Sequence, residues 1–99
     1  MSEKELKLKV LDYLKSIPNS FTMKLSDYCH SGYPDILFIW KKTPYFFELK
    51  DEKKGKIEPL QLWTLEQLHN AGAETYIIYN LKQIRKVLDK IQDERIIKE

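Results

Sequence analysis

Hydrophobic residues recur along this chain with two different periods, and the change of period divides it into helices and strands. Near the start, Leu6, Val10 and Leu14 are spaced four apart, which places them on one face of a helix. Elsewhere, short runs rich in β-branched and aromatic residues predict strands. The expected order is α-β-β-β-α-β-α, an α/β fold, with helices over 3–16, 59–71 and 81–91 and strands over 21–25, 36–40, 45–49 and 75–79.

The ends of the predicted helices carry ordinary start and stop signals. Ser2 and Glu5 form the S-x-x-E pattern of a capping box, and Pro18 follows the first helix as a breaker. Pro59 stands at a first-turn position, and Gly72 lies just past the end of that helix. We expect the end of the chain, residues 93–99, either to fray or to dock through Ile96 and Ile97.

Two of the predicted strands form a hairpin that gathers three ionisable residues. If Lys41–Pro44 is the loop, alternation of side chains along a strand places Asp35, Glu48 and Lys50 on one face. Asp35 and Glu48 are then diagonal neighbours, separated by about 7 Å. This register pairs Trp40 with Tyr45, Leu37 with Glu48 and Asp35 with Lys50.

Each part of this constellation has a simpler interpretation. A Pro-Asp pair often only opens a turn, and Glu-x-Lys on a strand is often an exposed ion pair. Glu48, however, interrupts an apolar run, where a carboxylate is costly unless it is paired or binds a metal. Oxygen ligands favour Mg²⁺, Ca²⁺ or Mn²⁺, so the hairpin predicts a metal-dependent hydrolytic site.

Length and composition indicate one domain, residues 1–99, with 42% hydrophobic residues. No apolar run approaches the ~20 residues of a membrane span, and the charged start does not resemble a secretory signal. We therefore expect a cytoplasmic protein that does not contact a membrane. Cys29, His30 and the distant His69 do not make a zinc ligand set, and Cys29 is interpreted as a reduced structural thiol.

The formal net charge of +2 does not by itself indicate nucleic-acid binding, because 17 basic residues face 15 acidic ones. Lysines nevertheless concentrate in the hairpin and the segment after it. Such a run is either a solvated face or a set of phosphate contacts, and its place beside the predicted site favours phosphate contacts. The candidate nucleic-acid-binding residues are Lys41, Lys42, Lys53, Lys54 and Lys56, with Tyr33 as an aromatic candidate.

Two further polar residues occupy helix positions that should face the core. Glu3 precedes Leu6 on the stripe of the first helix, where it either stabilises the helix dipole or points toward a cation. Gln61 lies on the sheet-facing stripe of the second helix, where it either caps a backbone group or reaches the reaction site. The pattern leaves both alternatives open.

Taken in order, these motifs resemble those of a known nuclease family. They are Ser31-Gly32-Tyr33-Pro34-Asp35, then Phe47-Glu48-Leu49-Lys50, then Gly55-Lys56-Ile57-Glu58-Pro59-Leu60-Gln61, then Leu68 and Gly72. The set resembles VRR-NUC, the virus-type replication-repair nucleases of the PD-(D/E)xK superfamily, over nearly the whole chain. Tyr33 departs from the family, in which smaller aliphatic residues are common there.

The resemblance implies a restriction-endonuclease-like fold with a central mixed sheet flanked by helices. It implies that Asp35, Glu48 and the backbone carbonyl of Leu49 bind Mg²⁺ or Mn²⁺. Lys50 would orient the attacking water or stabilise the phosphate charge, and Gln61 would lie near the active site. The family's early helix carboxylate matches Glu3 best, with Glu5 as the second choice.

The resemblance also suggests a phage or bacterial protein. In either case it would act in the bacterial cytoplasm, which is that of the host cell if a phage encodes the protein. Stand-alone members of the family suggest a homodimer that cuts branched DNA such as four-way (Holliday) junctions in DNA repair. No small-molecule cofactor is expected. The alternatives are a non-catalytic nucleic-acid-binding or assembly module with a nuclease fold, and a nuclease for flaps or other DNA structures.

Overall fold

The computed structural model describes residues 1–28, 32–53 and 55–98, and describes side chains as far as residue 93. The predicted order of helices and strands is confirmed, with one addition, a short 3-10 helix after the first strand. Cys29 and His30 lie outside the described residues. The elements are α1 (Glu3–Lys15), β1 (Ser20–Lys24), η1 (Leu25–Asp27), β2 (Ile36–Trp40), β3 (Thr43–Leu49), α2 (Pro59–Asn70), β4 (Glu74–Ile78) and α3 (Leu81–Lys98).

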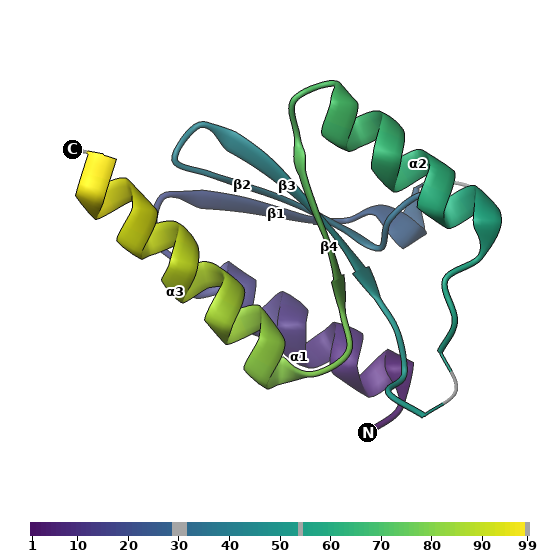
Figure 1. Cartoon of the computed structure of the whole chain (residues 1–99). Helices are drawn as coiled ribbons and strands as arrows, with labels where there is room; N and C mark the ends of the chain where they lie inside the picture. Colours follow the sequence, from purple (N-terminus) through teal and green to yellow (C-terminus); the bar gives the residue numbers. More distant parts are fainter. Residues whose placement is uncertain (29–31, 54, 99) are drawn as a thin grey trace.

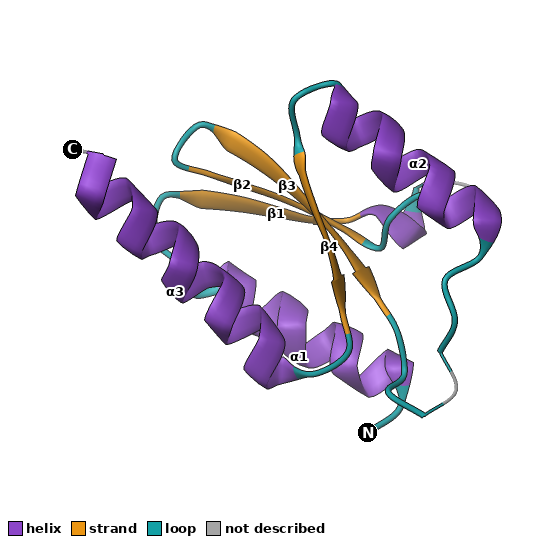
Figure 2. Ribbon diagram, viewed as in Figure 1, coloured by secondary structure: helices purple, strands orange, loops and turns teal. Residues whose placement is uncertain are grey.

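The strands form one mixed sheet in the order β1-β2-β3-β4, shown in orange in Figure 2. Strands β1, β2 and β3 pair antiparallel, whereas β4 runs parallel to β3. A parallel pair needs a crossover connection, and α2 provides it. Because β4 is the edge strand, β3 lies inside the sheet, and the residues at its end have β2 on one side and β4 on the other.

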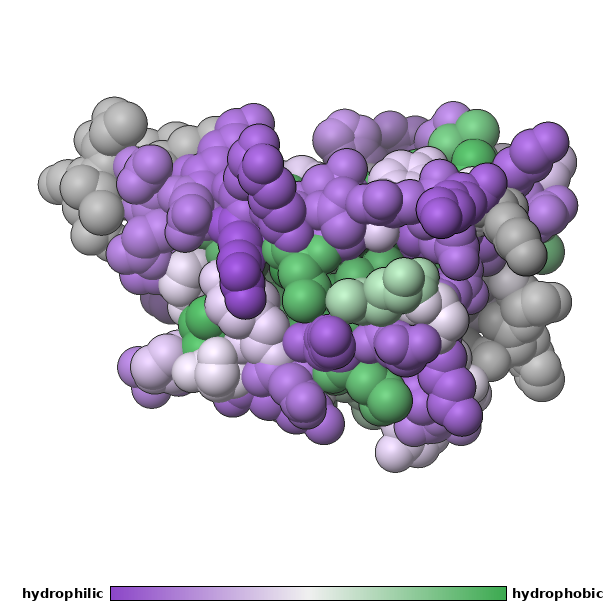
Figure 3. Space-filling model, turned by 90° about the horizontal axis from the view of Figure 1, so that it is seen from below, coloured by the Kyte–Doolittle hydropathy of each residue, from purple (hydrophilic) through white to green (hydrophobic). Residues whose placement is uncertain are grey.

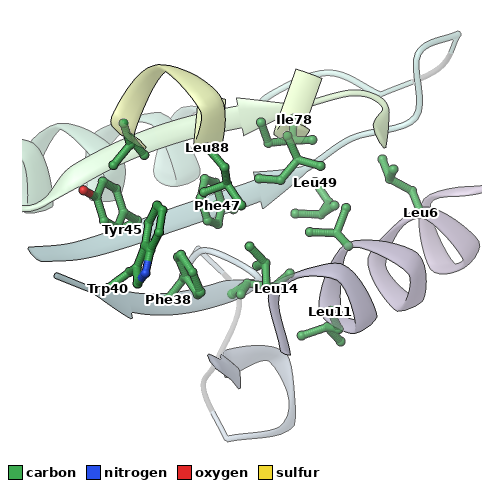
Figure 4. Close-up of a cluster of buried hydrophobic side chains, with 14 residues drawn as sticks. Leu6, Leu11, Leu14, Phe38, Trp40, Tyr45, Phe47, Leu49, Ile78 and Leu88 are labelled. Carbon is green, nitrogen blue, oxygen red and sulfur yellow. The ribbon is translucent and has the colours of Figure 1, made fainter. Parts of the chain in front are cut away.

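Helices cover both faces of the sheet, with α1 and α3 on one face and α2 on the other (Figure 1). The main core lies between the sheet and the α1–α3 pair, where alternate residues of β2 and β3 meet the apolar stripes of both helices (Figure 4). Its members are Leu6, Val10, Leu11, Leu14, Ile36, Phe38, Trp40, Tyr45, Phe47, Leu49, Ile78, Ile84, Leu88 and Ile91. The opposite residues of the same strands are left to face α2.

The predicted register of the hairpin is wrong by two residues. Trp40 pairs with Thr43, not with Tyr45, and Leu37 pairs with Phe46, not with Glu48. The loop is a tight turn of two residues, Lys41 and Lys42, with φ of 52° and 69°. Left-handed residues at both positions suit the right-handed twist of the strands better than the four-residue loop we predicted.

Because side chains alternate with a period of two, a shift of two residues moves none of them to the other face. Glu48 and Lys50 therefore stay on one face, as predicted, although their partners differ, and this face lies away from the α1–α3 core. The predicted pairing of Asp35 with Lys50 is replaced by contacts of Asp35 with Phe47 and Leu49, described below.

Helix α1 begins as its capping pattern predicts. The amide N–H of Glu5 donates to Ser2 Oγ at 3.1 Å, and the Ser2 hydroxyl donates to Glu5 Oε1 at 3.1 Å. At the other end of the chain, the backbone of α3 continues through Lys98, seven residues beyond the predicted end at Ile91. No described helix is both long and apolar enough to cross a membrane.

The outer side of the α1–α3 layer is mainly hydrophilic, and hydrophobic residues show in the middle of this side (Figure 3). Charged residues on the free faces of both helices account for this surface, since Lys4, Lys9, Lys86 and Lys90 are exposed.

Candidate active site

Asp35 stands immediately before β2 and is fixed by three hydrogen bonds. Its amide N–H donates to the Phe47 carbonyl at 3.1 Å, and its own carbonyl accepts from the Leu25 N–H at 2.8 Å. Its carboxylate oxygen Oδ2 accepts from the Leu49 N–H at 2.8 Å, so the side chain substitutes for a strand partner at the end of β3. Both the backbone and the carboxylate are therefore held in place.

Glu48 is the next-to-last residue of β3 and is only 3% exposed. Two donors meet its carboxylate oxygen Oε2: Gln61 Nε2 at 2.9 Å and Lys50 Nζ at 3.5 Å. A buried carboxylate is stable only with such partners. The strand places Glu48 and Lys50 on one face, and the crossover helix α2, which covers that face, brings Gln61 to Glu48.

The pKa of Glu48 is raised from 4.5 to about 7. Burial is the largest cause because it disfavours the charged form, and the negative charge of Asp35 adds to it. The Lys50 ammonium lowers the pKa by its charge and by its hydrogen bond, and Glu3 raises it slightly. The lysine thus compensates only part of the cost of burying two neighbouring carboxylates.

Gln61 satisfies both alternatives considered for it. Its Oε1 accepts from the Glu58 N–H at 2.9 Å and caps the start of α2, while its Nε2 donates to Glu48. One amide group therefore ties the first turn of α2 to the carboxylate at the end of β3. Removing it would loosen both the helix start and the Glu48 side chain.

Lys50 is 9% exposed, and its amide N–H donates to the Ile78 carbonyl of β4 at 2.9 Å. The following loop folds back closely on it, because the Gly55 N–H donates to the Asp51 carbonyl at 2.9 Å. A Cβ at Gly55 would lie 2.8 Å from Lys50 Cβ and 2.6 Å from the Asp51 carbonyl oxygen. Only glycine permits this close approach, which confines the stem of Lys50.

Helix α1 contacts β3 and brings two charged residues to the site. Glu3 is half-buried and close enough for its charge to raise the pKa of Glu48, whereas Glu5 is exposed and caps the helix. The structure thus places Glu3, and not Glu5, toward the site. In Figure 4 Leu6, in the same turn of α1, lies across from Leu49 at the end of β3.

Sequence analysis missed Lys7, whose Nζ lies 2.8 Å from Asp35 Oδ1. Lys7 follows Glu3 by four positions and therefore shares its helix face. That spacing was the available signal, but a lysine on a mixed helix face is ordinarily solvated. Here its side chain is only 18% exposed.

The candidate nucleic-acid-binding lysines separate into two groups. Lys41 and Lys42 form the hairpin tip, so the expectation that they lie beside the site is wrong; the five residues of β2 put about 15 Å between them. Lys41 instead lies over the Trp40 ring, 5.4 Å from its centroid. Lys53, Lys56 and Tyr33 are exposed in the loops at the site end of the sheet, and Lys54 lies outside the described residues.

The carboxylates fit a divalent cation in charge and in ligand type. The buried Glu48 and the partly buried Asp35 repel each other, and a cation between them would relieve this repulsion. The Leu49 N–H points to Asp35, and in an extended strand the carbonyl of a residue lies on the same edge as its N–H, so the Leu49 carbonyl faces this side too. Among the described side chains, no three His, Cys, Asp or Glu residues cluster around one point, so the site has two carboxylates and a backbone oxygen to offer.

Comparisons with known proteins agree with this geometry. One solved structure, named "VRR_NUC domain", is 25% identical and aligns over 90% of this chain and 97% of its own, with a TM-score of 0.73. Another, named "VRR_NUC domain protein", is 16% identical over 91% of this chain and 87% of its own, with a TM-score of 0.71, and supports the fold. No curated protein matches the sequence.

The resemblance to VRR-NUC proteins is thus confirmed, together with the fold that it implied. Nucleases of the PD-(D/E)XK kind generally use divalent metal ions. The model of that superfamily matches residues 1–99, and the chain belongs to the PD-(D/E)XK nuclease superfamily.

Proposed function

We propose that this protein is a Mg²⁺- or Mn²⁺-dependent endonuclease that hydrolyses phosphodiester bonds in structured DNA. The observation that carries the proposal is the buried Glu48 carboxylate, which shares a face with Lys50, is held by Gln61 and interacts with Asp35. Holding a buried carboxylate beside a second, partly buried one destabilises a fold, so such a pair is typical of a site whose function requires it. Binding a cation is the function that this arrangement suits best.

In this mechanism Asp35 and Glu48, with the Leu49 carbonyl, would hold the ion. When bound, it supplies positive charge that polarises the phosphate and lowers the pKa of water. Lys50 contributes a fixed positive charge where negative charge develops in the transition state. Gln61 keeps Glu48 in one orientation, and Glu3 adds negative charge at the edge of the site. Lys53, Lys56 and Tyr33 would contact DNA near the site, and Lys41, Lys42 and Lys54 would extend the phosphate contacts.

For the substrate we propose four-way junctions, cut by a homodimer whose two sites act on two strands. The support for the dimer is apolar surface on α2, where Leu60, Leu62 and Trp63 are 54%, 42% and 58% exposed. Beside it lies a hollow of about 630 Å³ between α2 and β4, lined in part by Leu62, Leu65 and Ile77. Several exposed large apolar residues on one helix are typical of protein contacts.

Cleavage of labelled DNA tests the activity and the substrate together. Four-way junction, flap and plain duplex are incubated with Mg²⁺, Mn²⁺ or EDTA, using the unmutated protein, Glu48→Ala and Asp35→Ala. We expect metal-dependent cutting of the junction that both variants lose, while Asp89→Ala, which removes an exposed carboxylate on α3, retains it. DNA binding without cutting of any substrate would contradict the proposal and favour a binding module. Preferential cutting of flaps would overturn only the junction assignment.

Light scattering tests the dimer. We expect twice the chain mass at assay concentrations, and a shift toward the monomer for Trp63→Ser, because Trp63 is the largest exposed side chain of α2. An unmutated protein that is monomeric and still cuts both strands of a junction would refute the dimer.

A further inference from the structure

Lys7 forms a partly buried ion pair that the proposed chemistry does not use. Its ammonium lies 2.8 Å from Asp35 Oδ1, and the two side chains are 18% and 13% exposed. A pair this close and this shielded is screened little by solvent. The Lys7 ammonium therefore occupies a position next to Asp35 where a metal cation would also be attracted.

Both oxygens of the Asp35 carboxylate are engaged. Oδ2 accepts the Leu49 N–H at 2.8 Å, and Oδ1 faces the Lys7 ammonium. The backbone amide cannot withdraw without disturbing the end of β3, whereas the lysine stem has rotatable bonds. A divalent ion that takes Asp35 must thus compete with Lys7 for Oδ1, and the two cations repel each other at that distance.

Next to this pair is a hollow of about 350 Å³ between α1 and η1. Its lining is rich in lysine: Lys4, Lys7 and Lys24 contribute, with Glu3, Ser26 and Asp27. Lys24 also pairs with Asp27 at 3.2 Å. The hollow thus holds three ammonium groups against two carboxylates, and a Lys7 ammonium released from Asp35 would be free to contact a phosphate group there.

We propose that Lys7 is a built-in counter-ion of Asp35 that a divalent metal ion displaces, and that the released ammonium then contacts a DNA phosphate in the hollow between α1 and η1. This inference rests on the proposed function, because it takes Asp35 as a metal ligand. It makes metal binding and DNA binding cooperative through one side chain.

Metal affinity tests the competition directly. Mn²⁺ binding to the protein without DNA is measured by electron paramagnetic resonance for the unmutated chain, Lys7→Gln and Lys4→Gln. We expect Lys7→Gln to bind Mn²⁺ about tenfold more tightly, within the range usual for coupled sites. Lys4→Gln, one turn earlier and exposed, removes the same charge and should change the affinity by about twofold at most.

Affinity that is unchanged or weaker in Lys7→Gln, or an equal gain in Lys4→Gln, would overturn the proposal. Glu48→Gln separates this outcome from failure of the proposed function: if that variant binds Mn²⁺ as the unmutated protein does, the metal site itself is wrongly assigned. Circular dichroism in EDTA checks folding. If Lys7→Gln does not fold, Lys7→Met keeps the apolar stem and gives the same comparison.

DNA binding tests the second half of the proposal. Junction affinity is measured against salt in EDTA and in Ca²⁺, with gels showing that the DNA stays intact. In Ca²⁺, Lys7→Gln should reduce the slope of log affinity against log salt by about 0.9, the value for one phosphate contact, and in EDTA it should change the slope little. Lys4→Gln should act equally in both. An effect of Lys7→Gln that is the same with and without metal would refute the release of Lys7.

Discussion

Replacing Glu48 with glutamine should remove a pH dependence of stability that comes from burying this carboxylate. The substitution preserves the shape of the side chain, which is 3% exposed, but removes its titration. In the native protein burial and Asp35 raise the pKa of Glu48 to about 7, against 4.5 in the unfolded chain. The native state therefore binds a proton more tightly than the unfolded state between these two values.

The sign and size of the effect follow from this difference. The contribution of Glu48 to the free energy of unfolding is largest below pH 4.5 and falls as the pH rises to about 7. Above that pH this contribution is lost entirely. At about 1.4 kcal/mol for each pKa unit, the loss amounts to about 3 kcal/mol. The stability of the unmutated protein minus that of Glu48→Gln should thus fall by about 3 kcal/mol between pH 4.5 and 8.

Urea unfolding in EDTA, followed by the fluorescence of the buried Trp40, measures this difference. Glutamine also changes the partner of Lys50 at every pH, so the change of the difference with pH is decisive and its absolute value is not. Asp89→Asn, an exposed substitution on α3, should stay within about 0.5 kcal/mol of the unmutated protein. A difference for Glu48→Gln that is constant across the pH range would refute the reasoning.

A bound divalent ion should offset the free-energy cost of burying the ionised Glu48 carboxylate. At pH 8, a metal concentration a hundred times its dissociation constant should stabilise the unmutated protein by about 2.7 kcal/mol. Glu48→Gln should gain much less, because it lacks one of the two carboxylates. Equal stabilisation of both proteins would place the metal elsewhere.

Three further changes test the fold and the DNA surface. Gly32→Ala should cost about 1–3 kcal/mol in urea unfolding, because φ is +98° and the new Cβ would lie 2.6 Å from a side-chain carbon of α2; Gly72→Ala, at φ +108° with nothing within 4 Å, should cost less. Phe38→Ala should cost about 3–5 kcal/mol in thermal unfolding, since Phe38 is wholly buried; a loss below about 1 kcal/mol would contradict the packing. Lys53→Gln should weaken DNA binding at low salt more than Lys41→Gln, which lies at the hairpin tip; equal losses would indicate that the DNA spans the whole sheet.

The order of the elements was predictable because each depends on a pattern within a few residues. The spacing of Leu6, Val10 and Leu14 produced α1, and Pro59 began α2 where predicted. The shared face of Glu48 and Lys50 was also predictable, since it depends only on the period of two along a strand.

The register and the partners of the site residues depended on tertiary structure. The backbone of Lys41 and Lys42 adopts the left-handed conformation, which two lysines do not indicate in a sequence. The predicted strand pairing was therefore wrong by two positions. That error left the faces intact because it was an even number of residues.

Contacts between distant segments were likewise beyond the reach of local patterns. Lys7 and Asp35 are 28 positions apart in the chain, and their ion pair exists only because α1 packs against the end of β3. Gln61 reaches Glu48 only because α2 crosses over the sheet between β3 and β4. The sequence by itself determined which residues face the site, through local periodicity, whereas packing of the helices on the sheet decided which charges meet there and how deeply they are buried.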